Sequence, residues 1–321
     1  MRPQERQPAE AELRGLARHA VGLVALTYFL LVFGASVRVH GAGLACPDWP
    51  LCFGRVVPPI DFGVALEFGH RVVAGVVSLG FLWLGARVWT HRAALGATTW
   101  RLVVLAAAVL ALQVVLGGLT VLELLAEWTV TSHLLAGNTF CLTLLLVALR
   151  VAEARRPVDR APVGAGLRAA SVGLAVLVAG QLALGGLVSS SHAGLACGTW
   201  PTCDGTTWFP TFSGLVGLQV THRIMAYLVL AAGLVPLALT GGRGRAGRAA
   251  WLVFGAILLQ ATIGISNVLL RMPVEITLAH TAGAAAVVLS TTWLAYEAWR
   301  APLGASHVVP RAPAVAEEGV A

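Results

Sequence analysis

The chain has 321 residues, of which 57% are hydrophobic and only 12% are charged, and its mean hydropathy is +0.80. This composition excludes an ordinary soluble domain and indicates a protein that crosses a membrane several times. The net charge is +7 and every basic residue is arginine. The arginines fall in short loops between apolar segments, so we expect them to set the membrane orientation and expect no nucleic-acid partner.

Eight apolar segments, each near the ~20 residues that a bilayer-spanning helix needs, follow a polar cytoplasmic lead at residues 1–15. They run over Leu16–Val39, Val64–Trp89, Thr98–Leu122, Thr129–Leu149, Leu167–Ser190, Gly214–Leu239, Ala249–Leu270 and Ile276–Trp299. The sequence therefore predicts an all-α polytopic membrane protein with eight transmembrane helices. We expect residues 300–321, which are rich in proline and alanine, to form a disordered cytoplasmic tail.

The arginines are unevenly distributed among the loops. The lead and the loops after the second, fourth and sixth segments each carry three to five arginines, whereas the other loops carry at most one, Arg55 or Arg271. Because arginine-rich loops stay in the cytoplasm, this pattern predicts both termini in the cytoplasm and the odd-numbered loops outside. The predicted location is the cell membrane.

Four of the five cysteines form two pairs of identical spacing, Cys46/Cys52 and Cys197/Cys203. Both pairs fall in loops that the arginines place outside, where disulfides persist. Their spacing favours a disulfide within each loop over a metal site, which remains the alternative. The fifth cysteine, Cys141, lies in an apolar segment and is expected to be a core residue.

The chain contains an internal repeat. The stretch Gly41–Cys52, which reads GAGLACPDWPLC, matches His192–Cys203, which reads HAGLACGTWPTC. Later matches pair His70-Arg71 with His222-Arg223, Gln113–Gly117 with Gln260–Gly264, and His133 with His280. Four spans per repeat give both halves the same orientation. We therefore expect two tandem four-helix bundles, at residues 16–150 and 167–299, joined by a cytoplasmic linker at residues 151–166.

Four of the nine histidines, His70, His133, His222 and His280, begin the even-numbered segments at the predicted outer side, two in each half. Two imidazoles at one depth in a four-helix bundle can hold a haem iron axially. Zinc or copper would want further ligands, and only Glu67 stands nearby. The pattern predicts one haem per half; the alternative is that each histidine is a satisfied interfacial polar group.

Two other sets of polar residues accompany the histidines. Arg71 and Arg223, which directly follow His70 and His222, are candidates either for contacts to haem propionates or for ordinary interface anchors. Three glutamines each stand four residues before a glycine within a span, namely Gln113, Gln181 and Gln260. We expect them to form interhelical hydrogen bonds beside small packing residues and do not expect them to be ligands.

The two halves differ at one informative position. When the repeats are aligned on His70 and His222, Glu67 falls opposite Gln219. A carboxylate can accept a proton or stabilise a developing positive charge, whereas an amide cannot take the proton. The first half is therefore the candidate reaction chamber and the second the candidate electron carrier. The alternative is that Glu67 only caps its helix or pairs with Arg71.

The combination of Glu-x-x-His-Arg at 67–71, Thr-His-Arg at 221–223, the two loop cysteine pairs and the later histidines resembles the haem A synthase family over residues 16–299. This resemblance implies that the first half binds the substrate haem O and the second half binds haem b. By position, it makes His70 and His133 ligands of haem O, His222 and His280 ligands of haem b, Glu67 the catalytic carboxylate, and Cys46–Cys52 a disulfide near the site.

The implied reaction is the oxidation of a ring methyl of haem O, through a hydroxymethyl group, to the formyl group of haem A, which terminal oxidases use. The implied partners are haem O synthase, a membrane electron acceptor such as a quinone, and membrane lipid. The oligomeric state stays open, and a homo-oligomer is compatible with the sequence.

Two other functions fit parts of the pattern. A two-haem membrane b-type cytochrome that carries electrons between quinone and a partner explains the four histidines but not the difference between Glu67 and Gln219. A transporter with parallel repeats needs ionisable residues near the middle of the membrane, and such residues are nearly absent here.

Overall fold

The computed structural model describes residues 3–304, and within that range the chain is helical, with eight long helices, one short 3₁₀ turn and no strand. The helices are α1 (Pro3–Val39), α2 (Phe62–Thr90), α3 (Arg92–Leu122), α4 (Glu127–Arg155), α5 (Ala165–Ser190), α6 (Gly214–Thr240), α7 (Gly244–Leu269) and α8 (Val274–Arg300), with the turn at Ala193–Leu195. Each of these eight is long and apolar enough to cross a membrane, so the predicted polytopic all-α fold is confirmed.

The helix ends extend beyond the predicted spans. Helix α1 begins at Pro3, inside the predicted lead, and α4 continues to Arg155, inside the predicted linker. These extra turns are rich in Glu, Ala, Leu and Arg, which favour helix even where the segment is too polar to lie in lipid. Of the predicted tail, residues 305–321 lie outside the described residues.

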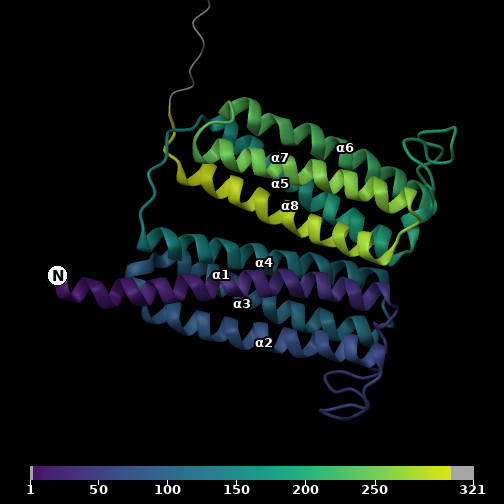
Figure 1. Ribbon diagram of the computed structural model, residues 1–321, viewed down its shortest axis with the longest axis horizontal. Coiled ribbons are helices and arrows are strands. Elements are labelled where there is room, and N and C mark those ends of the chain that lie inside the picture. Colours follow the sequence, from purple (N-terminus) through teal and green to yellow (C-terminus); the bar gives the residue numbers. More distant parts are fainter. Residues whose placement is uncertain (1–2, 305–321) are drawn as a thin grey trace, which may run out of the picture.

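The helices pack as two rings of four (Figure 1). In the first ring, α1 and α3 each contact both α2 and α4, and in the second, α5 and α7 each contact both α6 and α8. The rings meet where α1 packs on α8 and α4 packs on α5 and α8. These contacts are compatible with the tandem repeat, since exchanging the halves turns the α1–α8 contact into the α5–α4 contact.

Helix α4 lies at the contact between the two rings, where it packs on α5 and α8. Of its apolar span 56% is buried, against 17–33% for the other spans. Between the rings, Thr131 of α4 and Ser190 of α5 lie with their hydroxyl oxygens 3.2 Å apart, and the Tyr28 hydroxyl of α1 donates to the carbonyl of Ala282 of α8 at 2.9 Å. The inter-ring contact therefore includes specific polar pairs as well as apolar packing.

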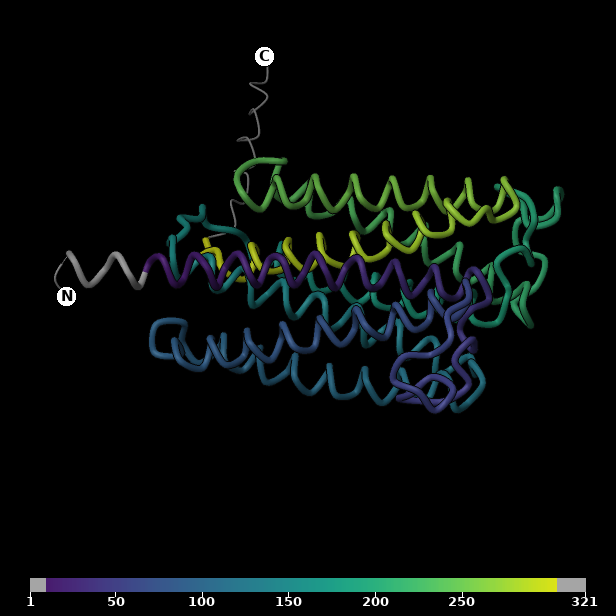
Figure 2. The backbone as a smooth tube through the Cα atoms, turned by 60° about the horizontal axis from the view of Figure 1, so that its bottom comes forward, coloured from purple at the N-terminus to yellow at the C-terminus, as the bar shows by residue number. Residues whose placement is uncertain are grey.

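The two ends of the molecule differ. The long loops at residues 40–61 and 191–213 both lie at what we call the disulfide end, opposite the N-terminus, one beside each ring (Figures 1 and 2). Cys46 is bonded to Cys52 and Cys197 to Cys203, as predicted, while Cys141 is a buried free cysteine. The loops after α2, α4 and α6 lie at the opposite, arginine end.

A partly buried ion-pair network lies at the arginine end. Arg160, in the segment between α4 and α5, donates to Glu153 of α4 at 2.7 Å and to Glu297 of α8 at 2.8 Å. Arg245 of α7 also donates to Glu297, and Arg300 of α8 to Glu153, each at 2.8 Å. The network joins the linker to both rings.

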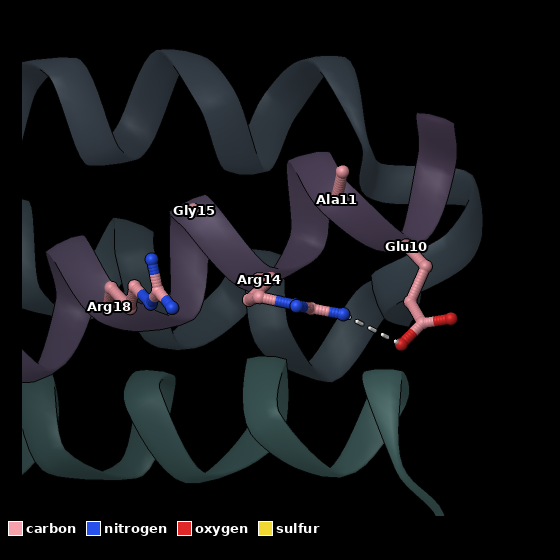
Figure 3. A pocket seen from close by; sticks show the side chains of 5 residues that line it. All are labelled: Glu10, Ala11, Arg14, Gly15 and Arg18. Atoms are coloured by element: carbon pink, nitrogen blue, oxygen red, sulfur yellow. Dashed lines mark hydrogen bonds and ion pairs between the residues drawn. The ribbon is translucent and has the colours of Figure 1, made fainter. Parts of the chain in front are cut away.

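An open pocket of about 440 Å³ also lies at the arginine end, along α1 (Figure 3). Its side chains include Glu10, Arg14 and Arg18, with the Arg14 guanidinium 3.4 Å from the Glu10 carboxylate. Arg18 stands sixteen residues before Gly34, which is about 24 Å along the helix axis at ~1.5 Å per residue. This pocket therefore lies far from the histidines, which occupy the other end.

Candidate functional site

The four histidines form one layer near the disulfide end. His70 and His222 each stand eight residues after the first residue of α2 and α6, and His133 and His280 each stand six after that of α4 and α8. At a rise of ~1.5 Å per residue these offsets place the histidines about 9–12 Å from the helix starts. Each ring thus contributes two imidazoles, from helices that are not neighbours in the ring, at the same depth.

A glycine on the preceding helix lies against each imidazole. A Cβ added to these glycines would approach the imidazole Cε1 to 3.0 Å at Gly34–His70, 3.1 Å at Gly117–His133, 3.2 Å at Gly185–His222 and 2.9 Å at Gly264–His280. These separations are tighter than ordinary van der Waals contact, so a side chain there would push the ring away. The same glycine–imidazole packing therefore occurs four times, once on each pair of consecutive helices.

Three of the imidazoles also contact a glutamine one helical turn before that glycine. The amide nitrogen of Gln113 lies 3.2 Å from Nε2 of His133, that of Gln181 lies 3.4 Å from Nε2 of His222, and that of Gln260 lies 3.1 Å from Nδ1 of His280. The interhelical hydrogen bonds expected for these glutamines are thus confirmed. No motif in the sequence indicates that the partners of these glutamines are the candidate ligands.

Several buried polar atoms of this layer have no hydrogen-bond partner among the described residues. They are Nδ1 of His70, His133 and His222 and Oε1 of Gln113, Gln181 and Gln260. Two imidazoles per ring, with spare polar atoms and glycines beside them, fit the axial ligation of a haem iron. No group of three or more His, Cys, Asp or Glu side chains suited to a bare metal ion occurs within residues 3–304.

Glu67 lies between the histidine layer and the first disulfide loop. It is 5% exposed, its Oε2 accepts the N–H of Cys46 at 2.8 Å, and its Oε1 accepts Nη2 of Arg71 at 2.5 Å. Helix α2 is capped instead by Asp61, which accepts the N–H of Val64 at 2.8 Å. The helix-cap alternative for Glu67 is therefore wrong, whereas its ion pair with Arg71 is present.

The two arginines that follow the histidines hold the disulfide loops. Arg71 donates through Nη1 to the carbonyls of Asp48 at 2.8 Å and Leu51 at 2.6 Å. Arg223 donates to the carbonyls of Cys197 at 2.7 Å and Thr202 at 3.2 Å. Anchoring is therefore the role that these contacts support, and the propionate contacts stay a prediction.

Gln219 occupies the place of Glu67 in the second ring. It is 4% exposed, and its amide nitrogen donates to the carbonyl of Gly194 at 3.2 Å. Both residues therefore tie their helix to the disulfide loop, but Glu67 accepts a loop N–H whereas Gln219 donates to a loop carbonyl. This tie was missed from sequence, because neither loop partner is identifiable from a motif.

Comparison with known proteins agrees with these features. The model of a family described as COX15-CtaA, cytochrome oxidase assembly protein, matches residues 17–292. The haem A synthase of Shewanella oneidensis is 31% identical over 88% of this chain and 96% of its own. That of Methylobacterium radiotolerans is 32% identical over 84% and 86%, and that of Symbiobacterium thermophilum is 36% identical over 67% and 70%. The chain therefore belongs to the COX15-CtaA family, that of the haem A synthases.

Proposed function

We propose that this protein is a haem A synthase, a membrane oxidoreductase that converts a ring methyl of haem O, through a hydroxymethyl group, to the formyl group of haem A. The first ring, α1–α4, binds haem O between His70 and His133. The second ring, α5–α8, binds haem b between His222 and His280. Family membership supports the reaction, and the fourfold glycine–imidazole packing supports the four ligands.

The assignment of roles rests on one difference between the rings. The buried residue that hydrogen-bonds the disulfide loop is Glu67 in the first ring and Gln219 in the second. Both rings bury a residue there, but only Glu67 can accept a proton, because Gln219 is a neutral amide. Glu67 also lies three residues before His70, hence on the same face of α2. The carboxylate therefore stands beside the substrate site and is absent beside the cofactor site.

The overall conversion, R–CH₃ + H₂O → R–CHO + 4H⁺ + 4e⁻, releases four protons, two from the methyl carbon and two from the water, and takes four electrons from the methyl carbon. Glu67 accepts protons or directs the water, and its two donors, Cys46 N–H and Arg71, hold the carboxylate in place. Haem b, when bound, supplies one-electron transfer towards a membrane acceptor such as a quinone. Haem O synthase is the partner that would supply the substrate.

The orientation in the membrane follows from the two ends. The arginine end lies in the cytoplasm with both termini, and the disulfide end lies outside. The distribution of the arginines and the presence of disulfides at the opposite end both support this placement.

The test is a pigment analysis of purified wild type and of Glu67→Gln, with Gln219→Ala as the matched control in the other ring. Pyridine haemochrome spectra distinguish haems A, O and B. We expect Glu67→Gln to keep both haems bound but to contain haem O without haem A, and Gln219→Ala to keep forming haem A. Undiminished haem A formation in Glu67→Gln would refute the role, and haem B alone in wild type would favour the two-haem cytochrome.

A further inference from the structure

An arginine without a partner lies beside the histidine layer of the first ring. Arg38 stands four residues after Gly34 in α1, so the two residues share one face of the helix. Because Gly34 packs on His70, this face looks into the ring. At a rise of ~1.5 Å per residue, Arg38 lies about 6 Å nearer the disulfide end than Gly34. A positive charge therefore stands one helical turn beyond a candidate haem ligand.

The charge of Arg38 is not balanced by the protein. Arg38 is half-buried within the apolar span Glu10–Val39, and among residues 3–304 its guanidinium has no hydrogen-bond acceptor and no carboxylate partner. A charged side chain within a membrane span is costly unless it pairs or serves a function. Its position in the last turn of α1 favours a cation through the helix dipole, but that effect requires no burial. An anionic partner of Arg38 therefore remains to be identified.

The equivalent position in the second ring carries no charge. Gly34 and Gly185 each stand nine residues before the repeated Gly-Leu-Ala-Cys, so Arg38 corresponds to Ser189. The Ser189 hydroxyl is buried without a hydrogen-bond partner among the described residues. The rings thus differ in charge at a second position, near the same end as the difference between Glu67 and Gln219.

The two differences compensate each other. In the first ring, Glu67 forms an ion pair with Arg71 and cancels its charge. In the second ring, Gln219 is neutral, and Arg223 donates only to uncharged loop carbonyls. With Arg38, each ring has one uncompensated arginine at these equivalent positions. The same kind of anion next to both histidine pairs accounts for this balance, and the propionate groups of a haem are carboxylates.

We propose that Arg38 binds a propionate carboxylate of the substrate haem O and so fixes the rotation of that haem in the first ring. The inference rests on the proposed function. A guanidinium matches a carboxylate with two parallel N–H···O bonds. Two axial bonds, from His70 and His133, leave a haem free to turn about the line that joins them. A third contact, at the edge of the porphyrin, is what stops this rotation.

The rotation of the haem decides which methyl group is oxidised. Glu67 stands three residues before His70, so it lies about 4.5 Å nearer the disulfide end. Arg38 lies on the same side of the histidine layer, on α1, which packs against α2. A haem held by Arg38 therefore presents one defined edge to Glu67, whereas a haem free to turn would offer each of its ring methyls. Arg38 binds and orients the substrate and takes no part in proton or electron transfer.

The test compares haem O with its propionate dimethyl ester as probes. Full-length protein from cells that lack haem O synthase is titrated with each probe, and binding is followed by the Soret absorbance. We expect wild type to bind haem O on the order of tenfold to a hundredfold more tightly than the ester, as for a hydrogen bond to a charged group. Arg38→Gln should lose most of this preference, and Arg38→Lys, which keeps the charge, should retain part of it. The matched control is Arg55→Gln, a change of an exposed arginine at the same end, which should keep the preference.

The outcomes separate this inference from the proposed function. If wild type binds both probes equally, or if Arg38→Gln keeps the wild-type preference, the inference fails. The comparison on wild type needs no variant, so it decides even if Arg38→Gln does not fold. If haem O binds unchanged to His70→Ala and to His133→Ala, the proposed haem O site fails, and the proposed function with it. Loss of binding in both histidine variants together with equal binding of the probes to wild type overturns the inference alone.

Discussion

The backbone N–H of Cys46 donates to Oε2 of Glu67 at 2.8 Å, across 21 residues of sequence. This hydrogen bond makes the first disulfide loop part of the support of the candidate catalytic carboxylate. Arg71 completes the arrangement, since it binds the other carboxylate oxygen and also the loop carbonyls of Asp48 and Leu51. The loop, the carboxylate and the start of α2 therefore form one hydrogen-bonded unit.

The first prediction concerns this loop. Replacing Cys46 and Cys52 together by serine frees the segment that carries the Cys46 N–H, so Glu67 loses its fixed position. We expect haem A formation to fall on the order of tenfold to a hundredfold, the cost of a displacement of about 1 Å, while both haems stay bound. The measurement is the haem A to haem O ratio, and the equivalent change at Cys197 and Cys203 should alter that ratio much less.

The second prediction concerns Arg71. Its removal leaves the buried Glu67 carboxylate without a counter-charge, which typically costs about 3–5 kcal/mol. Its repeat equivalent, Arg223, stands beside the neutral Gln219, so its removal loses hydrogen bonds only, about 0.5–1.5 kcal/mol each. Thermal unfolding in detergent should therefore show Arg71→Ala to be less stable than Arg223→Ala.

A double variant separates charge from packing at this position. In Glu67→Gln/Arg71→Ala the buried charge is gone, so most of the destabilisation caused by Arg71→Ala should disappear. If the double variant is as unstable as Arg71→Ala alone, loop anchoring and not the ion pair accounts for the effect.

The third prediction concerns the glycines against the imidazoles. Gly185→Ala places a Cβ 3.2 Å from Cε1 of His222, which overpacks the contact at about 1–3 kcal/mol and displaces the ring. We expect loss of the second-ring haem with the first retained, and the opposite for Gly117→Ala, both read from the pigment content. Gly75→Ala is the control, since no atom lies within 4 Å of its added Cβ; equal pigment loss there would show a general effect of helix substitutions.

The fourth prediction concerns the arginine end. The Arg160 side chain is only 6% exposed and pairs with both Glu153 and Glu297, whose other arginine partners are Arg300 and Arg245. Arg160→Ala therefore removes charge-assisted hydrogen bonds but leaves each carboxylate one counter-charge, so we expect a loss of about 1.5–3 kcal/mol and a lower unfolding temperature. Arg156→Ala, a change of an exposed arginine in the same segment, should leave the unfolding temperature near that of wild type.

The sequence predicted the eight spans because hydropathy over some twenty residues reports directly on burial in lipid. It predicted two four-helix halves because the loop and histidine motifs recur. The ends of α1 and α4 were less accessible, since polar helix formers continue a helix beyond the bilayer. At such positions the hydropathy falls, but the backbone hydrogen bonds of the helix continue.

The site was only partly accessible from sequence. Four repeated histidines and the glutamines stood out by type and spacing. The tie between Glu67 and Cys46 did not, because any residue can supply a backbone N–H. Gly34 was not identifiable from sequence either, because only its contact with His70 in the folded protein distinguishes it from the other glycines of α1. A contact made by a backbone N–H, or by a glycine that has no side chain, leaves no recognisable motif in the sequence.

The contact between the two rings has a consequence for how such a chain could arise. The contacts between the rings, α1 with α8, α4 with α5 and α4 with α8, form a self-complementary set in which each contact maps onto another or onto itself. This is the geometry of a twofold-symmetric homodimer, here made covalent by the segment between α4 and α5. Two halves in one chain need not have identical sequences, unlike the two copies of a homodimer, so one half can carry an acid at position 67 and the other an amide at position 219.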